Sequence, residues 1–287
     1  MVAPRVLQIG LALSVVLLSS CCQSIRDVPG GRQQANENLD SVLWRHTSVE
    51  YRASAEQAYR WARIQLDAAL EAGTAARTAA LEQLGDYSEL PPAIILDVDD
   101  TTLESSPFQA RLVKSGRPFR RDLWNDWVRE GISPAVPGVL EFVRYARAKG
   151  VKVFYVSNRE YEVEDATRQN LEDVGFPVDA DGSDILSKKE RAEWGSDKTS
   201  RRAFIAQRYR ILLIVGDDLN DFLSGAMSNP EERAELGSRY RSYWGEKWIV
   251  IPNPMYGSWE RALYDHEMLP RSEKLRRKYR RLPTLGE

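Results

Sequence analysis

Short apolar runs that each end in polar residues constrain the fold of this chain more than any other feature of its sequence. Residues 93–96, 151–156 and 211–215 are largely apolar stretches of the kind that form buried parallel strands. A fourth run, 248–251, follows later in the chain. Helical patterns separate these runs, and strands that alternate with helices favour a parallel sheet covered on both faces. The sequence therefore predicts an α/β fold of the Rossmann-like kind.

The helical patterns show apolar residues at the spacing of one helix face. They lie at 139–146, 164–174 and 200–207. A capping-box pattern at 47–50 opens a further, longer helix and indicates an N-terminal helical region. Residues 104–136 follow no regular pattern, and we expect them to form a small cap-like insert.

Polar side chains follow three of the predicted strands. Asp97 and Asp99 come after the first, Ser157 after the second, and Asp217 and Asp221 after the third. In open parallel sheets, ligands bind outside the carboxyl ends of the strands. We therefore expect these side chains to meet at one edge of the sheet and to form the functional site.

Composition excludes several classes of function. The formal net charge of -2 over 287 residues argues against a general nucleic-acid binder. Cys21 and Cys22 are adjacent, and no CxxC motif or Cys/His cluster suits zinc. His46 and His266 are the only histidines, so a histidine relay has little material. Carboxylates remain as the main chemical resource.

Several carboxylates at one edge of a sheet repel each other unless a cation cancels their charge. Oxygen ligands combined with a substrate phosphate are the usual surroundings of Mg²⁺ in proteins. We therefore expect Mg²⁺ beside Asp97, Asp99, Asp217 and Asp221, with Lys198 as a further positive charge. A site of this composition is suited to a dianionic phosphate.

The first residues have the pattern of a targeting signal. Arg5 precedes an apolar run at 6–18, which is too short for a comfortable membrane span. The run ends in Leu18-Ser19-Ser20-Cys21, which resembles a bacterial lipobox. We expect a lipoprotein signal peptide at 1–20, lipid on Cys21, a flexible tether at 21–41 and a catalytic domain at 42–287. An ordinary signal peptide cut near Ser20 and a buried apolar helix are the alternatives.

Four segments resemble the motifs of haloacid-dehalogenase-type (HAD) phosphatases, in the expected order. Residues 95–101 resemble the first motif, 156–157 the second, Lys198 the third and 216–221 the fourth. The chain also resembles the lipoprotein e family of class C bacterial outer-membrane acid phosphatases and 5'-nucleotidases. The matching segments are 49–53, 97–107, 124–128, 135–138, 153–159, 215–222, 252–253, 256–257 and Trp259. Ser157 and Asp218 stand where close relatives often have Thr and Asn.

The resemblance implies a role for each acidic residue. Asp97 is the nucleophile that forms an aspartyl-phosphate, and Asp99 is the general acid and then the general base. Asp97, the backbone carbonyl of Asp99 and Asp217 bind Mg²⁺, and Asp221 positions the metal shell. An acid at position 99 favours phosphomonoesters over haloacids as substrates.

The resemblance also implies residues that hold the substrate. Ser157 and Lys198 bind phosphate oxygens and offset the charge of the transition state. The lysines at 188–189 are competing candidates for the role of Lys198. Asn158 and Arg159, which follow Ser157 in the same motif, are expected to contact the substrate.

Aromatic residues crowd the segments that we expect to overhang the site. Trp124 and Tyr256 fall on family positions that stack on a base, and Phe108 and Trp127 are weaker candidates. Nucleoside 5'-monophosphates are the leading substrates, and the family also suggests nicotinamide mononucleotide. The alternative is that Trp124 and Trp127, three residues apart, form one buried helical stripe.

A second class of function is a surface lipoprotein that binds a ligand such as haem, although His46 and His266 support such a site weakly. The basic segment 271–281 is interpreted as a solvated helix face or as a contact with anionic lipid headgroups. The expected location is the bacterial cell envelope, lipid-anchored at the outer membrane. The sequence leaves the oligomeric state open, a homodimer included.

Overall fold

The computed structural model describes residues 36–71 and 78–283. The predicted signal peptide, Cys21 and most of the predicted tether lie outside these residues. Within the described part of the chain, no helix is both long and apolar enough to cross a membrane.

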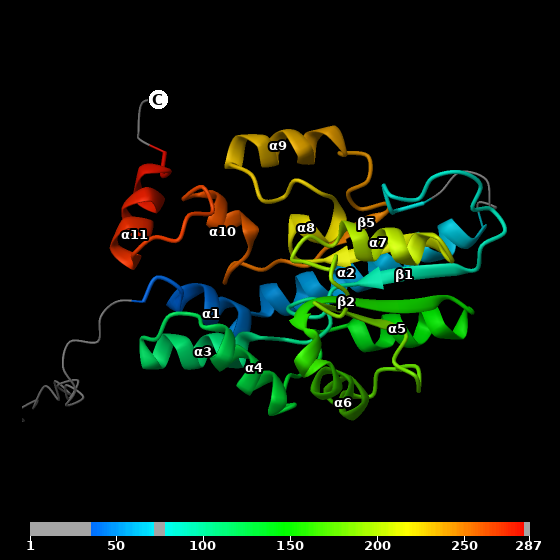
Figure 1. The fold of residues 1–287 in the computed structure, drawn as a ribbon, viewed down its shortest axis with the longest axis horizontal. Helices are drawn as coiled ribbons and strands as arrows, with labels where there is room; N and C mark the ends of the chain where they lie inside the picture. The colour runs from blue at the N-terminus through cyan, green and yellow to red at the C-terminus, as the bar shows by residue number, and fades with distance from the viewer. Residues whose placement is uncertain (1–35, 72–77, 284–287) are drawn as a thin grey trace, which may run out of the picture. The chain divides into compact units, whose positions relative to one another are not determined.

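A parallel sheet of five strands in the order β3-β2-β1-β4-β5 forms the centre of the fold (Figure 1). The strands are β1 (Pro92–Leu96), β2 (Lys152–Glu160), β3 (Ile185–Lys188), β4 (Arg210–Gly216) and β5 (Trp248–Val250). Leu96 at the end of β1 pairs with Tyr155 on one side and Val215 on the other. The carboxyl ends of β1 and β4 are therefore level, whereas β2 continues past them to Glu160, beyond its predicted end at 156. The short edge strand β3 was not predicted, because four residues carry too little pattern.

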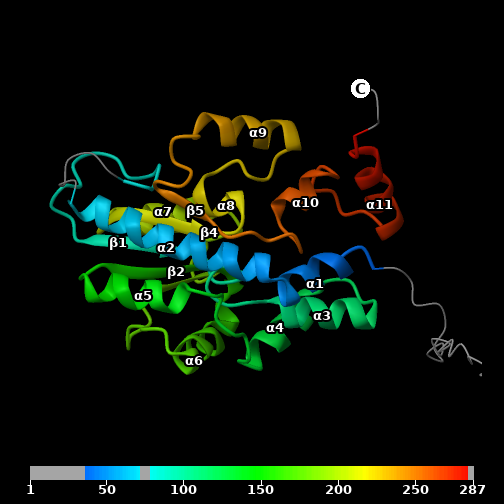
Figure 2. The same ribbon diagram turned by 180° about the vertical axis from the view of Figure 1, so that it is seen from behind.

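Helices cover both faces of this sheet, which confirms the predicted fold class. They are α1 (Leu39–Thr47), α2 (Val49–Glu71), α3 (Ser106–Ser115), α4 (Arg121–Arg129), α5 (Val139–Ala148), α6 (Glu164–Val174), α7 (Thr199–Ala206), α8 (Leu219–Phe222), α9 (Pro230–Arg239), α10 (Ser258–Ala262) and α11 (Arg271–Arg280), with a 3-10 turn η1 (Tyr161–Val163). Figures 1 and 2 show α2 and α5 on one side of the strands and α7 to α9 on the other.

The alternation of side chains along β1 explains the two layers. Ile94 and Leu96 pack into a core with α2 and α5, whereas Ala93 and Ile95 face the core that contains residues of α7 and α8. Successive side chains of a strand point to opposite faces, so a strand buried on both faces is apolar throughout.

The structure differs from the expectations for the local chain at three places. α1 begins at Leu39, so the folded part starts before the predicted tether end at 41. Thr47 ends α1 instead of opening α2, and the Ser48 side chain caps α2 by accepting the Tyr51 N–H at 3.1 Å. The insert at 104–136 contains α3 and α4 instead of irregular chain. Each of these helices is short, and the apolar cluster between them takes residues from both. Neither helix alone therefore shows a clear helical period in the sequence.

The basic C-terminal segment forms α11, whose cations are largely paired with acidic residues. Arg271 and Lys278 both contact Glu37, at 3.0 Å each, beside the start of α1. Arg277 pairs with Asp265 at 2.9 Å. These pairs bind the helix to the domain, and they leave less charge for anionic lipid than the sequence suggests.

Candidate active site

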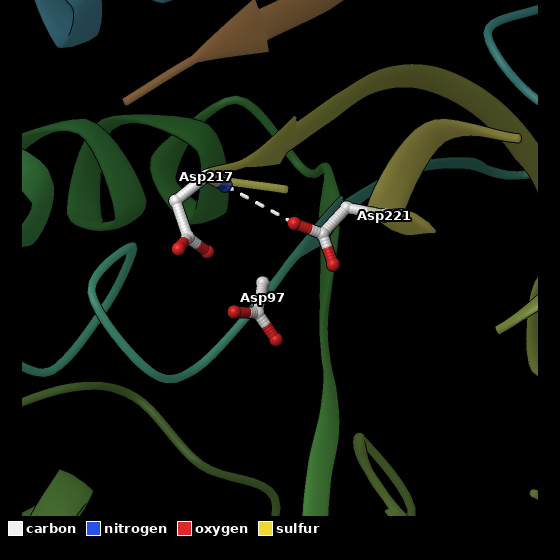
Figure 3. A group of neighbouring side chains, drawn as sticks. All are labelled: Asp97, Asp217 and Asp221. Atoms are coloured by element: carbon white, nitrogen blue, oxygen red, sulfur yellow. Dashed lines mark hydrogen bonds between the residues drawn. The ribbon is translucent and has the colours of Figure 1, made fainter. Parts of the chain in front are cut away.

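Three carboxylates meet at the carboxyl edge of the sheet (Figure 3). Asp97 follows β1, Asp217 follows β4, and Asp221 lies on α8. One oxygen from each lies within 4.8 Å of the others, and Asp97 and Asp221 are buried. The tight turn between β4 and α8 depends on Gly216, because a Cβ there would approach an Asp221 oxygen to 2.3 Å.

Burial and mutual repulsion make this arrangement unfavourable without a cation. Burial, opposed by Lys198, raises the pKa of Asp97 to about 7. Burial together with the charges of Asp221 and Asp97 raises the pKa of Asp217 well above its ordinary value. A divalent cation with oxygen ligands removes this cost, since it favours the ionised form of each carboxylate. The residues present therefore fit a hard metal ion.

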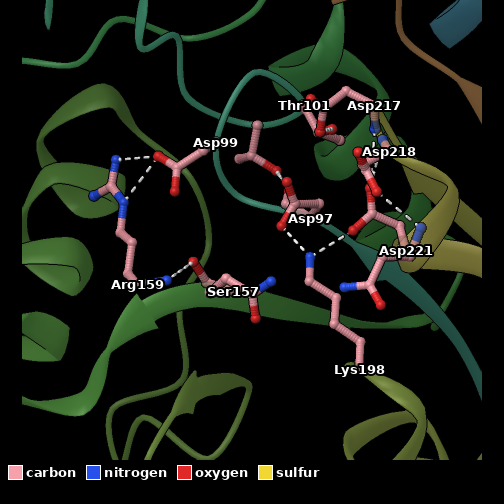
Figure 4. Close-up of polar contacts among 12 residues, drawn as sticks. Asp97, Asp99, Thr101, Ser157, Arg159, Lys198, Asp217, Asp218 and Asp221 are labelled. Carbon is pink, nitrogen blue, oxygen red and sulfur yellow. Dashed lines mark hydrogen bonds and ion pairs between the residues drawn. The ribbon is translucent and has the colours of Figure 1, made fainter. Parts of the chain in front are cut away.

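Lys198 supplies a cation between two of these carboxylates (Figure 4). Its ammonium donates to an oxygen of Asp97 and, at 2.6 Å, to Oδ1 of Asp221. Burial would lower the pKa of Lys198, but Asp221 and Asp97 outweigh it and raise that pKa. Lys189, one of the competing lysines, pairs with Glu160 at 2.8 Å instead.

Asp221 has the contacts of a positioning residue. Its Oδ2 accepts the backbone N–H groups of Asp217 and Asp218, at 3.1 Å and 2.9 Å. Its Oδ1 accepts from Lys198. Both oxygens are therefore engaged, and they hold Asp221 between Lys198 and the backbone that follows β4.

Asp99 lies apart from the three carboxylates and pairs with Arg159 (Figure 4). The guanidinium of Arg159 donates to one Asp99 oxygen at 3.0 Å and 2.8 Å. Burial raises the pKa of Asp99 although Arg159 opposes the shift. Ser157 Oγ accepts the Arg159 backbone N–H at 3.0 Å and can still donate its own hydrogen. Arg159 thus holds Asp99, and its predicted contact with substrate remains a prediction.

Two arginines that sequence reasoning missed support the site from α7. Arg201 donates to the side chain of Asn158 at 2.7 Å, so that amide is engaged within the protein. Arg202 donates to the backbone carbonyls of Asn220 and Asp221, at 3.1 Å and 3.0 Å. Lys198, Arg201 and Arg202 are three and four residues apart, the spacing of one helix face. Cations at this spacing after Lys198 are the sequence signal that could have predicted Arg201 and Arg202 as site residues.

Three side chains fix the acidic residues and were also not predicted. Thr102 Oγ1 donates to the backbone carbonyl of Asp97 at 2.6 Å. Thr101 Oγ1 and Asn253 Nδ2 donate to the two carboxylate oxygens of Asp217, at 3.3 Å and 2.7 Å. These bonds leave Asp217 little rotational freedom.

The predicted aromatic pocket is mostly a packed cluster between α3 and α4. Phe108, Trp124 and Trp127 are buried together, and Trp124 is only 5% exposed. The Trp124 ring lies 5.0 Å from each of the other two. This packing favours the alternative interpretation of Trp124 and Trp127 as a core stripe. Phe119, 6.2 Å from Trp124, is 52% exposed and carries the accessible face of the cluster.

The remaining predicted residues lie elsewhere in the site or outside it. Tyr256 directs its hydroxyl to Asp100, one residue after Asp99. His46 is exposed, and His266 contacts the Ser228 carbonyl at 3.0 Å. In the described part of the chain, the acidic trio is the one group of three potential metal ligands, and it contains no histidine.

A parallel sheet with clustered aspartates and a lysine at its carboxyl edge is the arrangement that the HAD-type motifs predict. Residues 14–259 match the family described as HAD superfamily, subfamily IIIB (acid phosphatase), and the chain belongs to that family.

Solved structures resemble the whole described domain. The class C acid phosphatase from Bacillus anthracis is 36% identical with a TM-score of 0.76, over 86% of this chain and 97% of that one. A tungstate-bound crystal structure of the class C acid phosphatase from that organism is 35% identical with a TM-score of 0.77, over 88% and 99% of the two chains.

Plant proteins match over a shorter part of the chain. Acid phosphatase 1 of Solanum lycopersicum is 28% identical over 166 residues, or 56% of this chain and 57% of that protein. The stem 28 kDa glycoprotein of Glycine max is 25% identical over 172 residues, or 56% and 58%. This chain therefore spans somewhat more than half the length of these relatives.

Proposed function

We propose that this protein is an Mg²⁺-dependent acid phosphatase that hydrolyses phosphomonoesters through an aspartyl-phosphate. The observation that carries the proposal is the convergence of Asp97, Lys198 and Asp217, with Asp99 held by Arg159 at the same edge of the sheet. The family and the Bacillus anthracis structures support it. Tungstate is a tetrahedral oxyanion like phosphate, so the tungstate-bound relative supports an oxyanion site.

In the proposed reaction an Asp97 oxygen attacks phosphorus, and the bond from phosphorus to the leaving oxygen breaks. Asp99 gives its proton to the leaving alkoxide; burial favours this protonated form, and Arg159 holds the carboxyl group. Asp99 then takes a proton from water, which attacks phosphorus. The bond from phosphorus to the Asp97 oxygen breaks, which releases inorganic phosphate and restores the Asp97 carboxylate. Lys198 and the Ser157 hydroxyl offset the negative charge of the phosphoryl group.

The proposed metal ligands are Asp97, Asp217 and the backbone carbonyl of Asp99, and Asp221 orients them. A bound Mg²⁺ would supply positive charge to the carboxylates and to the phosphate oxygens. Magnesium is preferred because each candidate ligand is oxygen and the substrate carries phosphate.

Nucleoside 5'-monophosphates remain the proposed substrate class. The exposed ring of Phe119 extends the aromatic cluster, and an aromatic face stacks on a base whatever its identity. Arg121 lies 5.5 Å from that ring. We assign the stacking role to Phe119 in preference to the buried Trp124.

Phosphate release from a panel of phosphomonoesters, measured with Mg²⁺ and with excess chelator, tests the function. We expect turnover only with the metal. Full activity in chelator would overturn the metal-dependent mechanism. A protein that binds haem, seen by an absorbance titration, and releases no phosphate would favour the alternative of a ligand-binding lipoprotein.

The proposed location is the bacterial cell envelope, with lipid on Cys21. One acyl chain binds membranes only marginally, whereas several anchor a protein stably. Cys21→Ser should release active enzyme into the soluble fraction, as fractionation followed by a phosphatase assay would show. If the variant stays with the membrane, Cys21 is not the anchor.

A further inference from the structure

A buried arginine from the N-terminal helix α1 lies behind the acidic edge, outside the four motifs. The side chains of Arg45 and Asp100 are both 0% exposed, and a guanidinium nitrogen of Arg45 lies 2.9 Å from Oδ1 of Asp100. The same nitrogen donates to the Asp100 backbone carbonyl at 3.2 Å. A buried carboxylate without a cationic partner is strongly unfavourable, and Arg45 is the cation that lies against Asp100.

Asp100 forms the turn that separates Asp97 and Asp99 from the chain that follows. Its φ of 60° lies in the left-handed region, which few residues other than glycine adopt. Its carboxylate secures that turn, since it accepts the Ser105 N–H at 3.0 Å and also the hydroxyls of Ser105 and Tyr256. Loss of the Asp100 charge partner should therefore disturb the loop that carries Asp99.

The same guanidinium reaches a second segment of the site. Arg45 also donates to the Pro252 carbonyl at 3.0 Å. The next residue, Asn253, donates its amide to Asp217 at 2.7 Å. One side chain thus joins the loop after β1 to the segment after β5, and each segment holds a different part of the acidic site.

We propose that Arg45 is a positioning residue for the metal and the acid/base: it fixes Asp99 through Asp100 and Asp217 through Asn253. This proposal rests on the proposed phosphatase function for its catalytic consequence, but its effect on metal binding stands independently. The N-terminal helix is on this view part of the active-site scaffold. Tyr59 of α2 supports the same loop, because its hydroxyl donates to the Thr101 carbonyl at 2.5 Å.

The test compares Arg45→Met with Leu66→Ala, a variant of a buried α2 residue that packs in the core. Mg²⁺ affinity is measured by calorimetry on each intact protein, kcat and KM by phosphate release, and Tm by thermal unfolding. Residues that orient metal ligands typically contribute about 10–100-fold in metal affinity or activity. We expect a loss of that size in both Mg²⁺ affinity and kcat for Arg45→Met. Leu66→Ala should lower only Tm.

Arg45→Lys serves if the methionine variant does not fold, because it keeps the charge but not the planar fork that spans both segments. We expect a smaller loss in the same direction. The proposal would be overturned if a folded Arg45 variant had the same Mg²⁺ affinity and kcat as the wild type. Losses no larger than those of Leu66→Ala would overturn it as well. A wild-type protein without turnover would refute the proposed function instead, and the calorimetry would still decide the role of Arg45.

Discussion

The acidic edge of the sheet and the aromatic cluster of α3 and α4 differ in what places their residues. At the edge, Asp97 and Asp217 follow strands whose ends are level, and each has named polar partners. In the cluster, Trp124 and Phe119 are positioned by packing between two short helices. Backbone topology therefore determines the chemistry of the first region. In the aromatic cluster, side-chain packing determines which residues remain accessible to solvent.

The largest effect is expected from the nucleophile at the edge. Asp97→Asn is nearly isosteric and removes one buried negative charge, so the fold should survive while turnover falls by about four orders of magnitude or more. Steady-state phosphate release measures the turnover, and circular dichroism measures whether the fold survives. Asp181→Asn, an exposed change of the same type on a distant loop, should leave activity unchanged. An active Asp97→Asn enzyme would remove the proposed mechanism.

The second effect separates the acid from the nucleophile. Asp99→Asn keeps an oxygen for Arg159 but cannot protonate a leaving group. We expect kcat/KM for glycerol phosphate to fall by about 10²–10⁴-fold. For p-nitrophenyl phosphate the fall should be much smaller, since its leaving group needs no proton. Equal losses for both substrates would show that Asp99 acts by position alone.

The third prediction addresses the aromatic cluster directly. Trp124→Ala removes a buried ring and should lower the free energy of unfolding by about 3–5 kcal/mol. It should depress kcat/KM for all substrates alike. Denaturant unfolding and kinetics on two substrates measure these effects in the same variant.

Phe119→Ala is the contrasting variant, because its ring is half exposed. A stacked base is worth about 1–3 kcal/mol, and about 1.4 kcal/mol corresponds to tenfold in affinity. We therefore expect a selective loss for nucleoside monophosphates, with glycerol phosphate nearly unaffected. If Trp124→Ala shows the selective loss instead, the buried ring must become accessible to substrate.

The smallest effect concerns metal, pH and stability at the edge. Burial first, then the charges of Asp221 and Asp99, raise the pKa of Asp97 from 3.8 to about 7 in the metal-free protein. The folded state then holds a proton that the unfolded state has released, so this contribution to stability falls as pH rises from about 4 to about 7. Mg²⁺ needs the ionised carboxylate, so its stabilising effect should grow across the same window.

Thermal unfolding with and without Mg²⁺ at the two ends of this window measures the effect. For a chain of this size, each kcal/mol of binding free energy should raise Tm by about 2–4 °C. Asp217→Asn should abolish the Mg²⁺-dependent rise. An equal rise at pH 4.5 and pH 7 would contradict the link between ionisation and metal binding.

The sequence by itself determined the sheet and the residues at its edge. Apolar runs predicted four of the strands, and the polar residues after them predicted Asp97, Asp217 and Asp221 as one group, to which the family resemblance added Lys198. The physical reason is local: an apolar strand must be buried, and a parallel sheet brings the ends of its strands together. Such patterns are contained in a few consecutive residues.

Only the tertiary structure decided what surrounds that edge. Arg45 and Asn253 contact the site across long stretches of chain, and no local period marks them. The exposure of Phe119 and the burial of Trp124 likewise depend on how α3 and α4 pack. A buried charge or ring is placed by partners distant in sequence, since the cost of burial is relieved only by the groups that meet it in the fold.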